Sequence, residues 1–175
     1  PTYVASAEGC RVTDIDGVSR IDFVGGYTVQ IHGHSHPEIV AAVQRQAEKV
    51  ISLTLPTELE IKLAEIFCQR TESIERVRFA NSGSEAVMIA LKAARAHTGR
   101  PKIAKCEGSY HGSYDFAEVS LDSGPATWGN AEPKSVPYSA GTPSSVLDEV
   151  VVIPFNHPKE SEHILRANAA HLSCV

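Results

Sequence analysis

The sequence is short of cysteine, of long apolar runs and of any signal-peptide pattern, and each shortage excludes a class of protein. The four cysteines are Cys10, Cys68, Cys106 and Cys174. They lie far apart and form no CxxC motif, which is typical of reduced thiols in the cytoplasm and not of a disulfide framework or a zinc site. No apolar run approaches the roughly 20 residues that a membrane helix needs, and the first residues show no basic stretch before an apolar one. The sequence therefore predicts a cytoplasmic globular protein that does not act at a membrane.

Charge of one sign is not in large excess either. Lysine and arginine number 16 and aspartate and glutamate 21, so the formal net charge is 16 − 21 = −5. This balance gives no broad attraction to nucleic acid or to anionic lipid, although it leaves room for a small local anion site. With 175 residues, of which 42% are hydrophobic, the chain is long enough to bury the core of one domain.

The first third of the chain predicts a β-hairpin followed by two helices. Residues 10–24 contain two strand-like runs joined by an Asp-Gly turn. Apolar residues at helical spacing predict a helix over residues 37–50. A second helix is expected to follow, because Thr57 and Glu60 have the spacing of a capping box.

Short strands and helices alternate from Val77 onward, which favours an α/β fold with a largely parallel sheet. The expected strands are residues 77–80, 102–106 and 150–153, and the expected helices are residues 84–97 and 158–171. Residues 122–145 are rich in Ser, Gly and Pro and are expected to form a long loop. The residues from Leu172 again have strand character with no turn after them. We therefore expect a fragment of a longer protein, with an incomplete sheet.

The segment Asn81-Ser82-Gly83-Ser84-Glu85-Ala86 joins an expected strand to an expected helix through a turn of small residues. Gly83 lets the backbone approach a ligand, and Ser82 and Ser84 offer hydroxyl groups. The unpaired amides and the dipole at a helix start attract an anion, so these residues can form a phosphate cradle without lysine or arginine. An ordinary serine-capped helix fits the same residues and stays open as the alternative.

A second candidate motif, Glu107-Gly108-Ser109-Tyr110-His111-Gly112, directly follows the next expected strand. In a parallel sheet, the turns after two neighbouring strands open at the same edge, where α/β proteins bind ligands. Tyr110 can stack on a flat aromatic ligand, and His111 can orient a polar group. A turn in which both side chains simply find protein partners stays open as the alternative.

Alternating histidines at His32, His34 and His36 would share one face of an extended strand, and imidazole is a common metal ligand. Gly33 and Pro37 favour a turn into a helix instead, and no carboxylate or cysteine completes a ligand set. We therefore expect no metal site, and a structural or pocket-rim role for these histidines.

Together the two motifs resemble the class III aminotransferases, a family of fold-type I pyridoxal-phosphate enzymes. Residues 81–86 and 108–112 match that family's paired motifs in order and spacing. Three upstream segments also match, and they are Asp14-Ile15-Asp16-Gly17, Ile21-Asp22-Phe23 and Gly33-His34-Ser35-His36-Pro37. The resemblance covers nearly the whole chain and is strongest to the glutamate-1-semialdehyde 2,1-aminomutase branch and its aminotransferase relatives.

The resemblance implies a fold and a cofactor. Residues 56–175 would form the first part of the cofactor-binding large domain of a fold-type I transferase, with a mostly parallel sheet and flanking helices. Residues 1–55 would form a small N-terminal segment of hairpin and helix before it. The cofactor would be pyridoxal 5′-phosphate, with its phosphate held by Ser82, Gly83 and Ser84.

The resemblance also assigns three aromatic or imidazole side chains. Tyr110 would stack on the pyridine ring of the cofactor, and His111 would support it. Tyr27 falls where the family places an aromatic residue of the substrate pocket. The aminomutases usually have a tryptophan near that point, so the segment around Tyr27 departs from their pattern.

The implied activity is amino-group transfer in a cytoplasmic homodimer that acts on a small amine or amino acid. The transfer would be either a transamination or an internal transfer of the aminomutase kind. The family's catalytic lysine and the aspartate on the pyridine nitrogen lie in later strands, so no catalytic residue is expected in this chain and the fragment alone is expected to be inactive. Lys102 and Lys105 are no substitutes, because they belong to the strand before Tyr110. From the residues alone, a non-catalytic α/β module that binds a phosphorylated ligand remains the rival.

Overall fold

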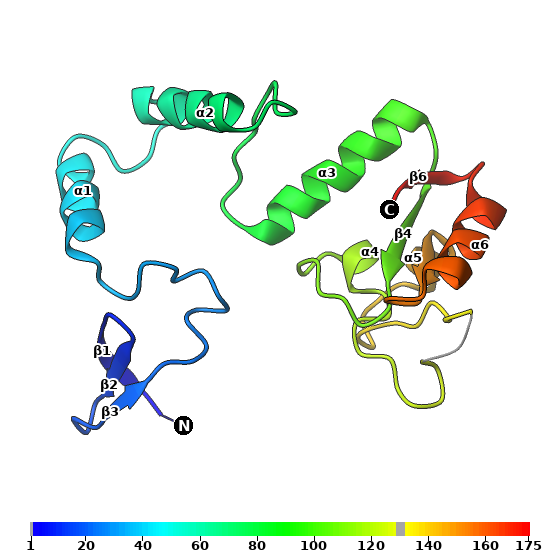
Figure 1. Ribbon diagram of the computed structural model, residues 1–175, viewed down its shortest axis with the longest axis horizontal. Coiled ribbons are helices and arrows are strands. Elements are labelled where there is room, and N and C mark those ends of the chain that lie inside the picture. The colour runs from blue at the N-terminus through cyan, green and yellow to red at the C-terminus, as the bar shows by residue number, and fades with distance from the viewer. Residues whose placement is uncertain (1, 129–131) are drawn as a thin grey trace. The chain divides into compact units, whose positions relative to one another are not determined.

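The computed structural model divides into two units, Pro1–Arg76 and Val77–Val175 (Figure 1). It describes residues 2–128 and 132–175. The sequence analysis expects a different boundary, after residue 55, between the N-terminal segment and the cofactor-binding domain of the family. That domain boundary stays a prediction. None of the helices in the described residues has the length and apolar character needed to cross a membrane.

The first unit begins with a three-stranded antiparallel sheet in the order β1-β2-β3. The expected hairpin is confirmed, since β2 (Arg11–Asp14) pairs antiparallel with β3 (Ser19–Ile21). Strand β1 (Val4–Glu8) pairs with β2 and was not expected from the sequence. Its small and polar side chains are largely exposed, so they leave no alternating pattern that a sequence argument could use.

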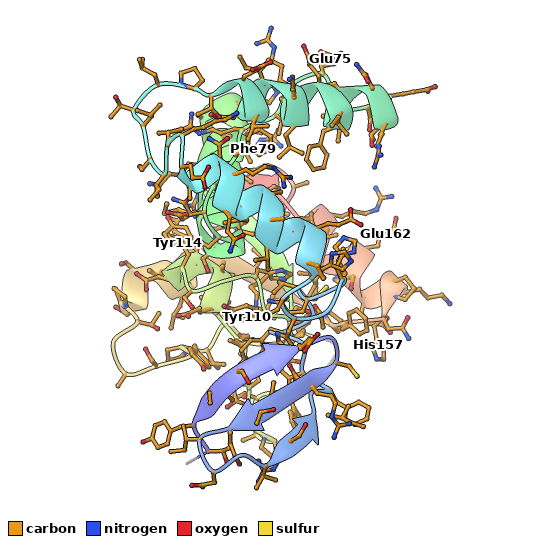
Figure 2. The ribbon with its side chains drawn as sticks, turned by 90° about the vertical axis from the view of Figure 1, so that its left-hand side faces the viewer. Glu75, Phe79, Tyr110, Tyr114, His157 and Glu162 are labelled. Atoms are coloured by element: carbon orange, nitrogen blue, oxygen red, sulfur yellow. The ribbon has the colours of Figure 1, made fainter. Side chains whose placement is uncertain are left out.

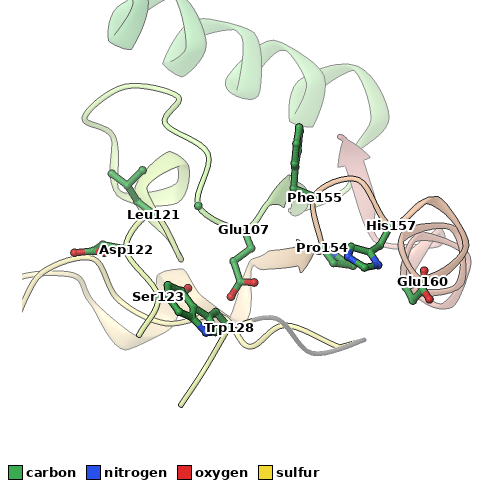
Figure 3. A pocket seen from close by; sticks show the side chains of 10 residues that line it. Glu107, Leu121, Asp122, Ser123, Trp128, Pro154, Phe155, His157 and Glu160 are labelled. Carbon is green, nitrogen blue, oxygen red and sulfur yellow. The ribbon is translucent and has the colours of Figure 1, made fainter. Parts of the chain in front are cut away.

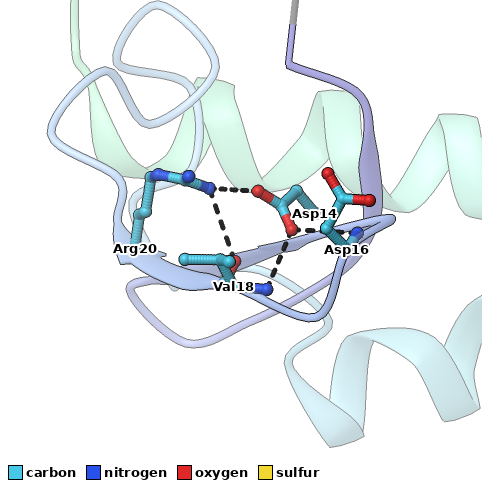
Figure 4. A network of polar contacts seen from close by, with 4 residues as sticks. All are labelled: Asp14, Asp16, Val18 and Arg20. Atoms are coloured by element: carbon cyan, nitrogen blue, oxygen red, sulfur yellow. Dashed lines mark hydrogen bonds and ion pairs between the residues drawn. The ribbon is translucent and has the colours of Figure 1, made fainter.

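The hairpin turn is organised by one buried carboxylate, that of Asp14 (Figure 4). Its Oδ1 accepts hydrogen bonds from the amides of Asp16 and Val18, at 3.1 and 2.8 Å. Its Oδ2 accepts from the guanidinium of Arg20. The bond from Arg20, followed by the bond from the Val18 amide, holds the pKa of Asp14 below its ordinary value.

We predict that Asp14→Asn weakens the hairpin, because the Arg20 guanidinium loses its charged acceptor. The amide of Val18 should lose protection from hydrogen exchange in this variant. Since folding lowers the pKa of Asp14, its contribution to stability is complete above the unfolded-state pKa of about 3.9 and is lost as the pH falls through the lower folded-state pKa. The protection factor of Val18 in the wild type should therefore fall toward that of the variant in strong acid.

Asp16→Asn is the matched control for this prediction. Among the described residues, the side chain of Asp16 makes no hydrogen bond, and only its backbone amide contacts Asp14. The control should keep the protection of the wild type. Equal loss of protection in both variants would show that the Asp14 carboxylate has no special role.

Two helices follow the sheet in the first unit, as expected. Helix α1 (Pro37–Ala47) has Pro37 in its first turn, where the missing amide hydrogen costs nothing. Helix α2 (Glu58–Arg70) is capped by Thr57, whose hydroxyl accepts from the amide of Glu60 at 3.4 Å. Neither helix has a buried residue, so their apolar stripes find no cover within this unit. Helices of this length draw most of their stability from packing of such stripes.

The second unit contains the expected parallel sheet with flanking helices (Figure 1). Strand β4 (Lys102–Cys106) is the middle strand, and β5 (Val150–Ile153) and β6 (Leu172–Cys174) pair with it in parallel on either side. The helices of this unit are α3 (Gly83–Thr98), α4 (Asp115–Glu118), α5 (Ser144–Asp148) and α6 (Pro158–Asn168). Helix α3 ends as expected at Gly99, which adopts a left-handed conformation with φ of 67°.

The expected strand at residues 77–80 is wrong. Among the described residues, this segment forms no strand and belongs to no sheet. Phe79 (labelled in Figure 2) is half-buried, while Arg78 and Ala80 are exposed. Burial therefore alternates along the segment, as it does in a strand, but a strand also needs a hydrogen-bonding neighbour. The short helices α4 and α5 were not expected, and α5 begins inside the segment predicted as a loop.

The core of the second unit gathers on one face of the sheet. Ile103 pairs in register with Val150, and Lys105 pairs with Val152, so these side chains share that face. Val119 and Val146 cover it from the segments of α4 and α5. Burial of each such side chain contributes roughly 1.5–3 kcal/mol.

Candidate active site

Helix α3 begins at a capping network that the sequence motif predicts. The hydroxyl of Ser82 accepts from the amide of Glu85 at 3.2 Å, and the Glu85 carboxylate accepts from the amide of Asn81 at 2.8 Å. The serine-capped helix, open as an alternative on sequence grounds, is thus present. It still leaves donors for an anion, because the capping side chains accept from the amides of Asn81 and Glu85 and not from those of Gly83 and Ser84.

The amides between them are available to a ligand. Within residues 2–128 and 132–175, no protein group accepts from the amides of Gly83 or Ser84. Gly83 is exposed and Ser84 is half-buried. Helix α3 is 16 residues long, so its dipole adds positive potential at this point. The start of α3 therefore offers two free donors to an anion.

The structure brings the second motif against this helix start. The amide of Ser113 donates to Oγ of Ser84 at 2.9 Å. Gly112 packs so closely that a Cβ atom there would lie 2.6 Å from both Cα and Oγ of Ser84. The two motifs were expected to meet because they follow neighbouring strands. They meet instead through this close approach, since the described segment directly before α3 forms no strand.

Tyr110 and His111 lie on the segment between β4 and α4, residues 107–114, which we call the tyrosine loop (Figure 2). The Tyr110 side chain is 65% exposed, so its ring is free to cover a flat ligand. Partial burial, and then the charge of Lys105, lower the pKa of His111. The imidazole is therefore neutral near pH 7 and can both donate and accept a hydrogen bond.

A hollow of about 580 Å³ opens at the carboxyl ends of β4 and β5 (Figure 3). Glu107 and Gly108 follow β4, and Pro154 and Phe155 follow β5. Its other lining residues are Leu121, Asp122, Ser123, Trp128, His157 and Glu160. This edge is where open α/β sheets hold their ligands. Sequence reasoning missed the hollow because its walls come from three segments that share no motif.

Tyr27, the expected substrate-pocket residue, lies in the first unit. Its side chain is 89% exposed, and its φ of 57°, like that of Thr28 at 74°, is in the left-handed region. The turn is anchored by Asp22, whose carboxylate accepts from two turn amides and contacts Nε2 of His34 at 2.7 Å. The substrate role of Tyr27 stays a prediction.

The alternating histidines contact other side chains of the first unit. His34 contacts Asp22, and the rings of His32 and His36 meet edge to face at 6.0 Å. In the part of the chain that the structure describes, no group of three or more His, Cys, Asp or Glu side chains is arranged to hold a metal ion.

Comparison with known proteins identifies related sequences over the whole chain. The family model for class III aminotransferases matches residues 1–140. The chain is 41% identical to the glutamate-1-semialdehyde 2,1-aminomutase of Thermodesulfovibrio yellowstonii, over 100% of this chain and 40% of that protein. It therefore spans about 40% of the length of the curated relatives it matches.

Solved structures also resemble the chain. An omega-transaminase from Sphaerobacter thermophilus matches with a TM-score of 0.93 and 50% identity, over 99% of this chain and 40% of that one. A transaminase solved with pyridoxal phosphate bound matches with a TM-score of 0.90 and 48% identity, over 100% of this chain and 40% of that one.

Proposed function

Because the chain belongs to the class III aminotransferase family, we propose that it is part of a pyridoxal-phosphate-dependent enzyme that transfers amino groups. One observation carries the proposal: the free amides at the start of α3 lie against the loop that bears the exposed Tyr110. Such a site suits a ligand with an anionic group next to a flat ring, which describes this cofactor. The chain also has the fold of a transaminase that was solved with it.

We assign the phosphate to the start of α3. The amides of Gly83 and Ser84 would donate to the phosphate oxygens, and the helix dipole would add to their attraction. Oγ of Ser84 already accepts from the amide of Ser113, so its own hydrogen remains to be donated. Ser82 caps the helix and keeps these donors in place.

We assign the ring to the tyrosine loop. Tyr110 would cover one face of the pyridine ring and exclude water from it, and the neutral His111 would support Tyr110 from the same loop. The bound cofactor supplies the electron sink for the carbon that carries the amino group. The family's catalytic lysine and the aspartate on the pyridine nitrogen are, on this proposal, outside residues 1–175. This chain then binds and orients the cofactor and does not move the proton itself.

We favour transfer between two molecules over internal transfer. The chain is 50% identical to the omega-transaminase and 41% identical to the aminomutase. The Gly-Gly-Tyr turn at Tyr27 also departs from the tryptophan usual in aminomutases. The substrate class is then a small amine or amino acid with a carbonyl acceptor, and the family resemblance implies a cytoplasmic homodimer.

The test is to load the full-length protein with pyridoxal phosphate and add an amine donor. We expect the absorbance of pyridoxal phosphate to change to that of pyridoxamine phosphate, and to return when a keto acid is added. Residues 1–175 expressed alone should show no such exchange. Binding of inorganic phosphate without any amine-dependent change in the full-length protein would contradict the proposal and favour a non-catalytic phosphate-binding module.

A further inference from the structure

A buried lysine lies beneath the tyrosine loop. Lys105, in β4, is only 5% exposed, and its Nζ donates to the carbonyl oxygen of Val119 at 2.6 Å. Its neighbours on that face of the sheet are apolar core residues such as Ile103 and Val152. A lysine in such surroundings loses hydration, which makes it a costly choice for packing alone.

The hydrogen bond of Lys105 joins the end of β4 to the residue after α4, and a second hydrogen bond joins the same two regions. The amide of Gly108, just after β4, donates to the carbonyl of Ser120 at 2.8 Å. The two acceptors, Val119 and Ser120, are adjacent and fully buried. Tyr110 and His111 lie between these two hydrogen bonds in the sequence. Lys105 therefore helps to hold together the two ends of the segment that carries them.

The turn at Ser120 is fixed as well. The Ser120 hydroxyl donates to the carbonyl of Lys134 at 2.8 Å and accepts from the amide of Val136 at 3.0 Å. The Ser120 backbone also adopts a positive φ of 54°, which costs energy in a residue with a side chain. The Val119 carbonyl that Lys105 binds thus lies next to a residue that several hydrogen bonds hold in place. The Lys105 contact fixes the distance between this turn and β4.

Lys105 and His111 also border the same hollow. It has a volume of about 250 Å³, Cys106 is its other ionisable residue, and the remaining lining side chains are apolar. Burial lowers the pKa of Lys105, and the charge of Lys105 is the second cause, after desolvation, of the lowered pKa of His111. Lys105 therefore influences both the position of the tyrosine loop and the protonation of His111.

We propose that Lys105 is a positioning residue, which holds the tyrosine loop closed over the start of α3 and so sets Tyr110 and His111 for the cofactor. The geometric part stands on the hydrogen bonds and the burial. The part about the cofactor rests on the proposed function.

Three variants of the full-length protein separate these roles. Lys105→Met keeps the length of the side chain but removes the donor and the charge. Lys105→Arg keeps both. Lys102→Met makes the same chemical change at the other end of β4, where the half-buried side chain of Lys102 makes no hydrogen bond among the described residues.

Two measurements on the cofactor-free protein test the geometry. In Lys105→Met, hydrogen exchange of residues 108–119 should become faster, and the pKa of His111, followed by NMR of labelled histidine, should rise because a positive charge is gone. Lys105→Arg should restore the pKa, and Lys102→Met should change neither quantity. Wild-type exchange and an unshifted His111 in Lys105→Met, or equal changes in Lys102→Met, would overturn the proposal.

A third measurement tests the link to the cofactor. The affinity of Lys105→Met for pyridoxal phosphate should fall roughly tenfold, the size of effect expected for a lost charge-assisted hydrogen bond. Wild-type affinity in this variant would overturn the positioning role. Failure of the wild type to bind the cofactor would instead overturn the proposed function, while hydrogen exchange and the His111 titration would still decide the role of Lys105.

Discussion

Gly112→Ala should nearly abolish binding of pyridoxal phosphate. The new Cβ would lie 2.6 Å from Cα and Oγ of Ser84, and because Cα belongs to the backbone, the two motifs must move apart. The φ of Gly112 is +95°, so the alanine is strained as well. Overpacking and strain each cost about 1–3 kcal/mol, or about 2–6 kcal/mol together. If this cost destabilises the conformation that binds the cofactor, the affinity falls about thirtyfold or more.

Gly108→Ala is the matched control, because it adds strain without a clash. Gly108 has a φ of +69°, and a Cβ there meets nothing within 4 Å. Titration of the full-length variants with pyridoxal phosphate, with melting temperatures measured in parallel, should show a much smaller loss for Gly108→Ala. Equal losses would mean that strain in the tyrosine loop matters and its contact with Ser84 does not. Wild-type affinity in Gly112→Ala would contradict the assigned site.

Ser84→Ala should weaken binding of pyridoxal phosphate by about 1–3 kcal/mol, the range for a lost hydrogen bond to a charged group. The substitution removes the hydroxyl assigned to the phosphate, and it also removes the acceptor for the amide of Ser113. The comparison of two ligands identifies the cause. Affinity for pyridoxal, which has no phosphate, should change far less than affinity for pyridoxal phosphate.

Ser113→Ala provides the control for this variant. The contact of Ser113 with Ser84 uses the backbone amide, which alanine keeps. Binding of both ligands should therefore stay at the wild-type level. If Ser84→Ala weakens pyridoxal and pyridoxal phosphate equally, the Ser84 hydroxyl acts on the tyrosine loop and not on the phosphate.

Local rules predicted most elements of the chain. The start of α3 at Ser82 and its end at Gly99 follow from a serine cap and a glycine that accepts a left-handed backbone. The Asp-Gly turn of the first hairpin and the Thr57 cap of α2 depend likewise on residues next to each other in sequence. Such features can be predicted from the sequence because the residues that form them are only a few positions apart.

Contacts between distant residues decided the rest. Residues 77–80 have the pattern of a strand but no strand beside them in the described structure, and pattern cannot supply a partner. The residues that line the hollow at the carboxyl ends of β4 and β5 come together only when the sheet forms.

The sequence by itself determined the family and the order of most of the elements. It also predicted which residues would hold a phosphate and a flat ring. Only the tertiary structure decided that Gly112 rests on Ser84 and that Lys105 reaches the carbonyl of Val119. The physical reason is that caps and turns are set by hydrogen bonds within a few residues. Close packing between Ser84 and Gly112, and the burial of an amino group in a core, depend on where whole segments meet.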